Sequence, residues 1–245
     1  MIYAYAVCER PAADPPPRRR GLGGAALRAL EEGGLAAVYS RHRALRAQPS
    51  RGTLLAHERV VEAVMARGAV LPLRFGTAVE DERHLAAVLR ERHDELVRGL
   101  ERVRGRVEIG VRALALGEGG VAGQRAAGGQ RAGGGQRAAA GQRAVGDPQP
   151  ERSGRDYLLA RAREHRRAER AARELHAPLA ALAFDSRMRE APAAPAVLNA
   201  SYLVDASRAG DFRARIDELA AAQDDLRVLV TGPWPPYSFA PEGRA

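Results

Sequence analysis

The sequence predicts an α+β protein of two domains, a ferredoxin-like variant at the N-terminus and a small α+β domain with a long helix at the C-terminus. Short apolar stretches of alternating polarity predict strands, and longer stretches of helical periodicity lie between them. The 245 residues suffice for two hydrophobic cores. We place the domains at residues 1–104 and 105–245, the second with an insertion at residues 118–154.

The first strand is predicted at residues 2–7. Side chains alternate along a strand, so Tyr3 and Tyr5 are expected on one face and Ala4 and Ala6 on the other.

A hairpin and a helix are predicted next. Residues 25–30 and 35–40 flank a double glycine and favour a hairpin, and a helix is the alternative for the first of these stretches. Ser50 is typical of a helix N-cap, and Gly68 stands where that helix would end. Four side chains between them recur at helical spacing: Leu54, His57, Val61 and Val64.

A strand and a second helix complete the first domain. Residues 69–75 are mostly apolar, but Pro72 cannot donate a ladder hydrogen bond, so this strand is expected at an edge of the sheet or to begin near Pro72. Residues 80–104 show helical periodicity. These elements predict four strands with helices on one face.

The second domain is predicted to begin with a strand at residues 106–116, where apolar residues alternate most clearly. A long helix follows from Arg155, and Pro178 is expected to end or kink it. A strand, a helix and a strand then follow at residues 197–205, 211–222 and 226–230. Since two strands alone make a marginal sheet, we assign residues 106–116 to this domain as well.

Two segments favour irregular structure. Three prolines and three arginines at residues 15–20 predict a loop. Gly-Gln-Arg-Ala recurs every six residues from Gly123 to Ala144, with no apolar residue larger than alanine. Such a segment cannot bury a core, so we predict a disordered insertion that acts as a linker.

The charge composition gives a weak functional signal. The chain has 39 basic and 30 acidic residues and a formal charge of +9, yet every basic residue is arginine. Arginine therefore also fills surface positions where lysine would otherwise stand. Much of the excess positive charge is expected to lie on the solvated surface. The first ten residues lack the pattern of a secretory signal, and no apolar stretch reaches the roughly 20 residues of a membrane span.

Catalytic, metal and cofactor sites are not predicted. The single cysteine, Cys8, rules out a thiolate zinc cluster, and no two of the six histidines share the spacing of metal ligands on a helix. We interpret His57 as a partly buried structural residue rather than a general base, because no serine, cysteine or second acid forms a motif with it. Residues 21–26 fit a dinucleotide fingerprint, but a Pro- and Arg-rich stretch separates them from the preceding strand.

Two segments carry the candidate partner-binding residues. Arg74 and Phe75 lie in Leu71-Pro-Leu-Arg-Phe-Gly76, at the end of a strand. Trp234, Tyr237 and Phe239 lie in Thr231-Gly-Pro-Trp-Pro-Pro-Tyr-Ser-Phe239, where three prolines lower the conformational entropy that binding would cost. Two interpretations remain open for this segment: it presents its aromatic rings to a partner, or it folds back on a sheet with Trp234 in the core.

These segments together resemble the gas vesicle protein F/L family. The resemblance is carried by Ile2-Tyr-Ala-Tyr5, Leu71-Pro-Leu-Arg-Phe-Gly-Thr77, Tyr157-Leu-Leu159, Asn199-Ala-Ser-Tyr-Leu-Val-Asp205 and the segment that begins at Thr231. It covers nearly the whole chain, and the Gly-Gln-Arg-Ala insertion departs from it.

The resemblance implies a non-enzymatic accessory or minor structural protein of gas vesicle formation. It implies the apolar shell protein and other gas vesicle accessory proteins as partners, with no cofactor, specific nucleic acid, membrane or small-molecule ligand. The expected location is the gas vesicle, after a cytoplasmic stage before assembly. The alternative is a nucleic-acid-associated protein that uses the arginine-rich surface and linker, and an enzyme built on the ferredoxin-like sheet is the third possibility.

Overall fold

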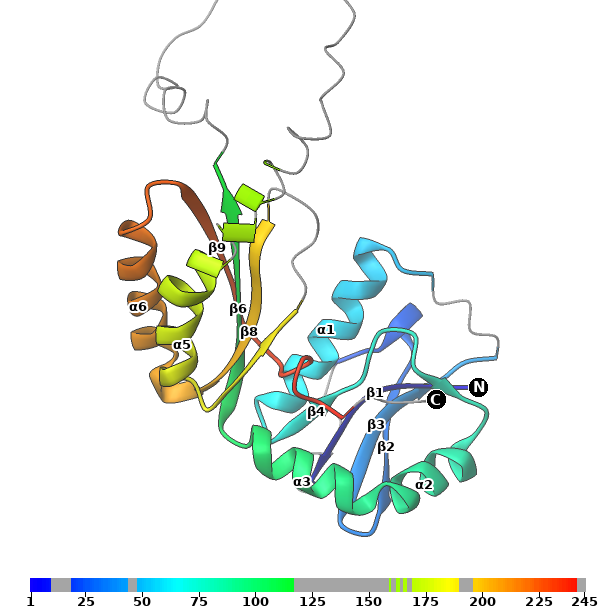
Figure 1. The fold of residues 1–245 in the computed structure, drawn as a ribbon. Coiled ribbons are helices and arrows are strands. Elements are labelled where there is room, and N and C mark those ends of the chain that lie inside the picture. Colours follow the sequence, from blue (N-terminus) through cyan, green and yellow to red (C-terminus); the bar gives the residue numbers. More distant parts are fainter. Residues whose placement is uncertain are drawn as a thin grey trace, which may run out of the picture.

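The computed structural model describes residues 1–9, 19–43, 48–116, 159, 162–163, 165–166, 169–189 and 196–241. These residues form two antiparallel sheets with flanking helices, which confirms the α+β prediction (Figure 1). The predicted Pro-rich loop lies largely outside the described residues, and the Gly-Gln-Arg-Ala repeat lies wholly outside them. Within the described ranges, no helix has both the length and the apolar character needed to cross a bilayer.

The first sheet has the strand order β2-β3-β1-β4, and a short strand, β5, also pairs with β1. The hairpin prediction is confirmed, with a strand in both arms, and β4 lies at an edge as Pro72 predicted. The strands are β1 (Ile2–Glu9), β2 (Leu27–Glu32), β3 (Leu35–Arg41), β4 (Val70–Pro72) and β5 (Ala78–Val79).

A β-bulge in β1 changes the predicted alternation. Ala4 pairs with Tyr39 and Ala6 pairs with Val38, so Tyr5 is an extra residue in the ladder. Ala6 therefore packs on the same face as Tyr3 and Tyr5, not with Ala4 as predicted. A bulge shifts the alternation by one residue, and strand periodicity alone does not reveal it.

Helices cover both faces of the first sheet, so the predicted single helical layer is wrong for this sheet. Helix α1 (Arg51–Met65) packs on the face that carries Tyr3 and Tyr5. Helices α2 (Glu82–Glu91) and α3 (His93–Val103) pack on the other face. Strand β1 is apolar and buried from Ile2 to Cys8, and a strand buried on both faces needs cover on both.

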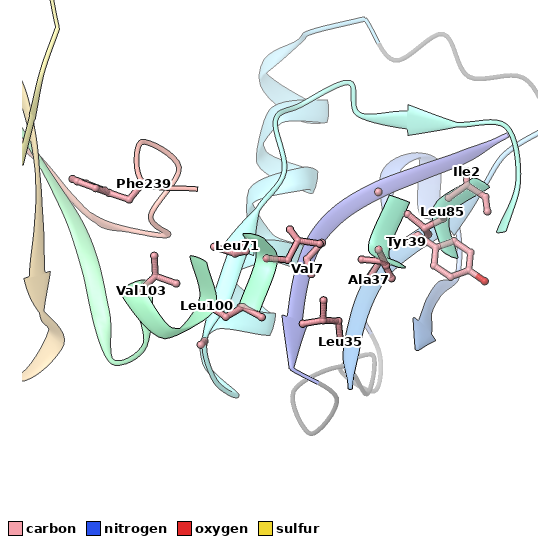
Figure 2. Packing of buried hydrophobic residues seen from close by; sticks show 14 of the residues in the cluster. Ile2, Val7, Leu35, Ala37, Tyr39, Leu71, Leu85, Leu100, Val103 and Phe239 are labelled. Atoms are coloured by element: carbon pink, nitrogen blue, oxygen red, sulfur yellow. The ribbon is translucent and has the colours of Figure 1, made fainter. Parts of the chain in front are cut away.

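Figure 2 shows the core on the α2 and α3 side. Leu85 and Leu100 from the two helices contact apolar side chains of the sheet, and Phe239 joins the same cluster from the end of the chain.

The predicted helix at residues 80–104 is in fact two helices that break at Arg92. Arg92 has φ −105° and ψ 15°, outside the helical region. Its guanidinium donates to Glu95 in the first turn of α3. Both helices keep their leucines on the sheet despite the break, which explains why the pattern resembles one continuous helix.

The second sheet has the order β7-β8-β6-β9. Its elements are β6 (Arg106–Ala115), α5 (Ala177–Leu182), β7 (Asp185–Met188), β8 (Ala196–Asp205), α6 (Ala209–Ala221) and β9 (Leu226–Trp234). This βαββαβ succession, with both helices on one face, is ferredoxin-like (Figure 1). The ferredoxin-like succession is thus found in the second half of the chain, where we predicted only a small α+β domain with a long helix.

The predicted strands at residues 106–116, 197–205 and 226–230 are confirmed in this sheet, and β7 was missed. Pro178 does not end the preceding helix. It lies in the first turn of α5, directly after a π-helical turn at Ala172–His176, and the helix continues to Leu182. The missing N–H of proline is tolerated in the first turn of a helix.

Candidate functional site

The end of the chain links the two sheets. After β9, residues 235–241 run across to the first sheet (Figure 1). Phe239 is 2% exposed and packs in the core beside α3, whereas Tyr237 packs on the α1 side. The segment therefore folds back onto a sheet, as one of the two interpretations proposed, but Phe239 and not Trp234 is its core anchor.

Glu108 on β6 fixes this C-terminal segment. Its carboxylate accepts hydrogen bonds from the backbone N–H of Ser238 at 2.8 Å and from the Ser238 hydroxyl at 2.5 Å. The Glu108 side chain is buried, and Arg189 also donates to the Ser238 hydroxyl. A buried carboxylate requires such donors, so the segment and Glu108 stabilise each other.

The segment Leu71–Thr77 is held by Tyr3 and His57. The backbone oxygen of Leu73 can only accept, so His57 Nε2 donates to it at 3.0 Å and Nδ1 accepts from the Tyr3 hydroxyl at 2.9 Å. The Tyr3 oxygen in turn accepts from the backbone N–H of Gly76 at 3.1 Å. Burial lowers the pKa of His57 to about 4, which keeps the ring neutral.

These contacts position Phe75. Its ring lies edge-on to His57, with the ring centroids 5.9 Å apart. The His57 ring also lies 6.4 Å from that of Tyr237, so one buried histidine packs between the two segments that carry the candidate residues. This agrees with the structural interpretation of His57.

An apolar groove of about 470 Å³ lies between α1 and the C-terminal segment. Leu54, Leu55 and Trp234 line it and are 45%, 44% and 43% exposed. Its other lining residues are His57, Glu58, Phe75, Glu108, Pro235 and Tyr237. Adjacent exposed apolar side chains of this size are typical of a binding surface for another macromolecule.

One carboxylate in the groove lacks a full set of partners. Glu58 Oε2 accepts a hydrogen bond from the Tyr237 hydroxyl at 2.8 Å, whereas the buried Oε1 has no hydrogen-bond donor. Burial raises the pKa of the Glu58 carboxyl, the Tyr237 hydrogen bond opposes this, and nearby Glu62 adds to it.

The structure brings three of the five candidate residues together. Phe75, Trp234 and Tyr237 line the groove. Arg74 is exposed on the same loop as Phe75 but does not line the groove, and Phe239 is a core side chain.

The other six lining residues were not predicted as site residues: Leu54, Leu55, His57, Glu58, Glu108 and Pro235. Leu55 was a usable signal, because the face of α1 that carries His57, Val61 and Val64 leaves it outside the core. Leu54 shares the spacing of that face but is exposed as well.

A second surface of note is the face of the second sheet opposite its helices. Arg112 pairs with Asn199 and Leu229 in the sheet, whereas its neighbours Val111 and Ala113 face the helices. By the same register Arg187 and Arg227 share the face of Arg112. All three arginines are exposed, and none forms an ion pair with another residue in the described part of the chain.

The remaining sequence motifs are structural. Leu22–Gly24 is a short 3-10 turn that leads into β2, so it offers no helix N-terminus to a dinucleotide. A side chain at Gly21 would collide with Tyr5, because its Cβ would lie 2.2 Å from the tyrosine oxygen. Among the described residues, no three His, Cys, Asp or Glu side chains are grouped so that they could hold a metal ion.

The fold and the site thus define an α+β protein of two sheets, joined by an aromatic C-terminal segment beside an apolar groove. Residues 1–241 match the family described as Gas vesicle synthesis protein GvpL/GvpF, and the chain belongs to this family. Its role therefore lies in gas vesicle formation, and the family is not a known class of enzyme.

Relatives and a solved structure agree with this assignment. The chain is 35% identical to gas vesicle protein L of Streptomyces sp., over 98% of this chain and 92% of that protein. It is 33% identical to gas vesicle protein F of the same source, over 97% and 98% of the two chains. The crystal structure of GvpF from Anabaena sp. has the same fold, with a TM-score of 0.76 at 20% identity over 99% of this chain and 97% of that one.

Proposed function

We propose that this protein acts in gas vesicle assembly by binding the apolar shell protein, and that the groove between α1 and the C-terminal segment is the contact surface. The exposure of Leu54, Leu55 and Trp234 around one groove carries the proposal. A shell subunit with one hydrophobic face aggregates before assembly unless another surface covers it, and an apolar groove can provide that cover.

The action is binding rather than catalysis. Two titratable groups of the groove serve structural contacts: His57 holds Leu73, and Glu108 holds Ser238. We further propose other accessory proteins of the same gene cluster as partners, and a location on the gas vesicle after a cytoplasmic stage. Residues 1–104 and 105–245 act as two domains that the C-terminal segment joins.

Trp234→Ala tests the groove. The exposed ring can be removed without opening the core, so we expect the variant to fold normally, to lose capture of the shell protein in a pull-down, and to form fewer vesicles in cells. The matched control is Leu229→Ala, which removes a side chain of 38% exposure from the second sheet. Normal shell-protein capture by Trp234→Ala would rule out this use of the groove.

Nucleic-acid binding is the second candidate, and the exposed arginines of the second sheet are the observation in its favour. Such a surface gives only weak, salt-sensitive contact with phosphates unless bases also stack on aromatic rings. We therefore expect no submicromolar affinity for a 20-nucleotide DNA strand at physiological salt. An affinity in that range, lost in the Arg112→Gln, Arg227→Gln variant, would favour this second function.

A further inference from the structure

The groove combines apolar side chains with the Glu58 carboxylate, and Glu62, which is exposed and does not line the groove, lies near it. Glu58 and Glu62 lie four residues apart on α1, so they are neighbours on one side of the helix. Neither forms an ion pair within the part of the chain that the structure describes, although arginine is abundant. Like charges at this spacing destabilise a helix slightly, and nothing in the local fold compensates for it.

The Glu58 carboxylate is also incompletely satisfied. Tyr237 supplies one donor, and Oε1 is buried with none. Buried acceptors without donors are uncommon because they have lost water and gained no hydrogen bond. The same groove contains Glu108, but its two oxygens are occupied by Ser238. Glu58 is therefore the groove carboxylate that lacks a donor, and its side chain must turn outward for an incoming cation to reach the buried oxygen.

We propose that the groove takes an apolar segment of the shell protein that carries one arginine or lysine, with the cation bound by Glu58 and Glu62 and the apolar side chains packed on Leu54, Leu55 and Trp234. This rests on the proposed function. The charge complementarity sets the position of the segment, because a cation in an apolar sequence has one favourable place in this groove. The apolar contacts supply most of the affinity.

The raised pKa of Glu58 is consistent with this assignment. Burial disfavours the ionised form in the free protein, and a cation brought beside the carboxylate favours it. Binding is then expected to weaken as the pH falls and Glu58 becomes protonated.

The experiment uses the full chain and fluorescein-labelled overlapping peptides that cover the shell protein of the same organism. Anisotropy titrations identify the tightest peptide, and a second version of it replaces the single cation with norleucine. Two groove variants are compared with the wild type: Glu58→Gln, which keeps an acceptor for Tyr237, and the double variant Leu54→Ser, Leu55→Ser. Glu91→Gln, an exposed acid on α2, and Leu229→Ser, on the second sheet, are the matched controls.

We expect the double leucine variant to bind at least tenfold more weakly than the wild type. Glu58→Gln should weaken binding of the cationic peptide roughly tenfold, as loss of a charge-assisted hydrogen bond does. It should leave the norleucine peptide unaffected, and both controls should bind like the wild type.

The outcomes separate the two proposals. If the leucine variant loses binding while Glu58→Gln and the norleucine peptide behave like the wild type, the cation inference is wrong and the groove function stands. If the leucine variant binds normally, or if no peptide binds the wild type, both the cation inference and the groove function are overturned. Thermal melts of every variant check that each loss reflects the surface and not unfolding.

Discussion

At the scale of single residues, the aromatic side chains of the C-terminal segment have different roles. Phe239 is enclosed by the core beside α3, whereas Trp234 is 43% exposed at the groove. From the sequence, a tryptophan in a Pro-rich segment can be either a core residue or a partner contact. Which of these it becomes depends on where the segment crosses to the first sheet.

Phe239→Ala and Trp234→Ala should therefore differ in stability. We expect Phe239→Ala to lower the free energy of unfolding by about 3–5 kcal/mol, as large-to-small core changes do. Trp234→Ala should cost less, about 2 kcal/mol, since nearly half of its surface already contacts water. Urea denaturation of both variants measures this. Equal losses would show that Trp234 also belongs to the core.

His57 makes folding stability depend on pH. Its pKa is lowered to about 4 by burial in the folded state, against 6.5 for an ordinary histidine, so the unfolded chain takes up the proton first as the pH falls. The stability contributed by neutral His57 is thus complete above pH 6.5 and is lost towards pH 4, by roughly 3 kcal/mol at most.

His57→Gln is the reference for this measurement, because glutamine keeps a donor for Leu73 and does not titrate. The difference in unfolding free energy between the wild type and the variant should shrink as the pH falls from 6.5 to 4. Glu58 has a raised pKa and contributes stability in the opposite direction, towards low pH. Its contribution is the same in both proteins and cancels from this difference. A difference that stays constant over this range would contradict a buried neutral histidine.

At the scale of elements, β6 connects the second sheet to the C-terminal segment through Glu108. Glu108→Ala leaves the Ser238 N–H without its acceptor, which costs about 1–3 kcal/mol for a buried group. We expect amide exchange at residues 237–239 to accelerate at least tenfold, while the amides of the β2–β3 hairpin keep their protection. Unchanged exchange at Ser238 would show that core packing of Phe239 alone holds the segment.

Element boundaries were predicted with unequal success for physical reasons. The N-cap at Ser50 and the glycine turn between β2 and β3 are local signals, and both predictions are confirmed. The break at Arg92 and the bulge at Tyr5 are not local signals. On both sides of each irregularity apolar side chains pack in the cores of the first sheet, so its cause lies in residues distant in the sequence.

At the scale of the whole molecule, the Gly-Gln-Arg-Ala repeat is expected to be dispensable for folding. Deletion of residues 122–147 should leave the melting temperature almost unchanged, because the repeat has no apolar residue larger than alanine with which to join a core. Differential scanning calorimetry of the deletion protein tests this. A drop of many degrees, or loss of the cooperative transition, would mean that the repeat takes part in the fold.

The sequence by itself determined the α+β class, the family and most strands and helices. Periodicity, capping residues and short motifs depend only on residues that are close together in the sequence. It also indicated Phe75, Trp234 and Tyr237. Only the tertiary structure decided that helices cover both faces of the first sheet and that the second sheet has the ferredoxin-like succession. It alone placed Leu54, Leu55 and Glu58 beside a segment some 180 residues further along the chain. Such contacts depend on how whole elements pack, and no local pattern encodes that packing.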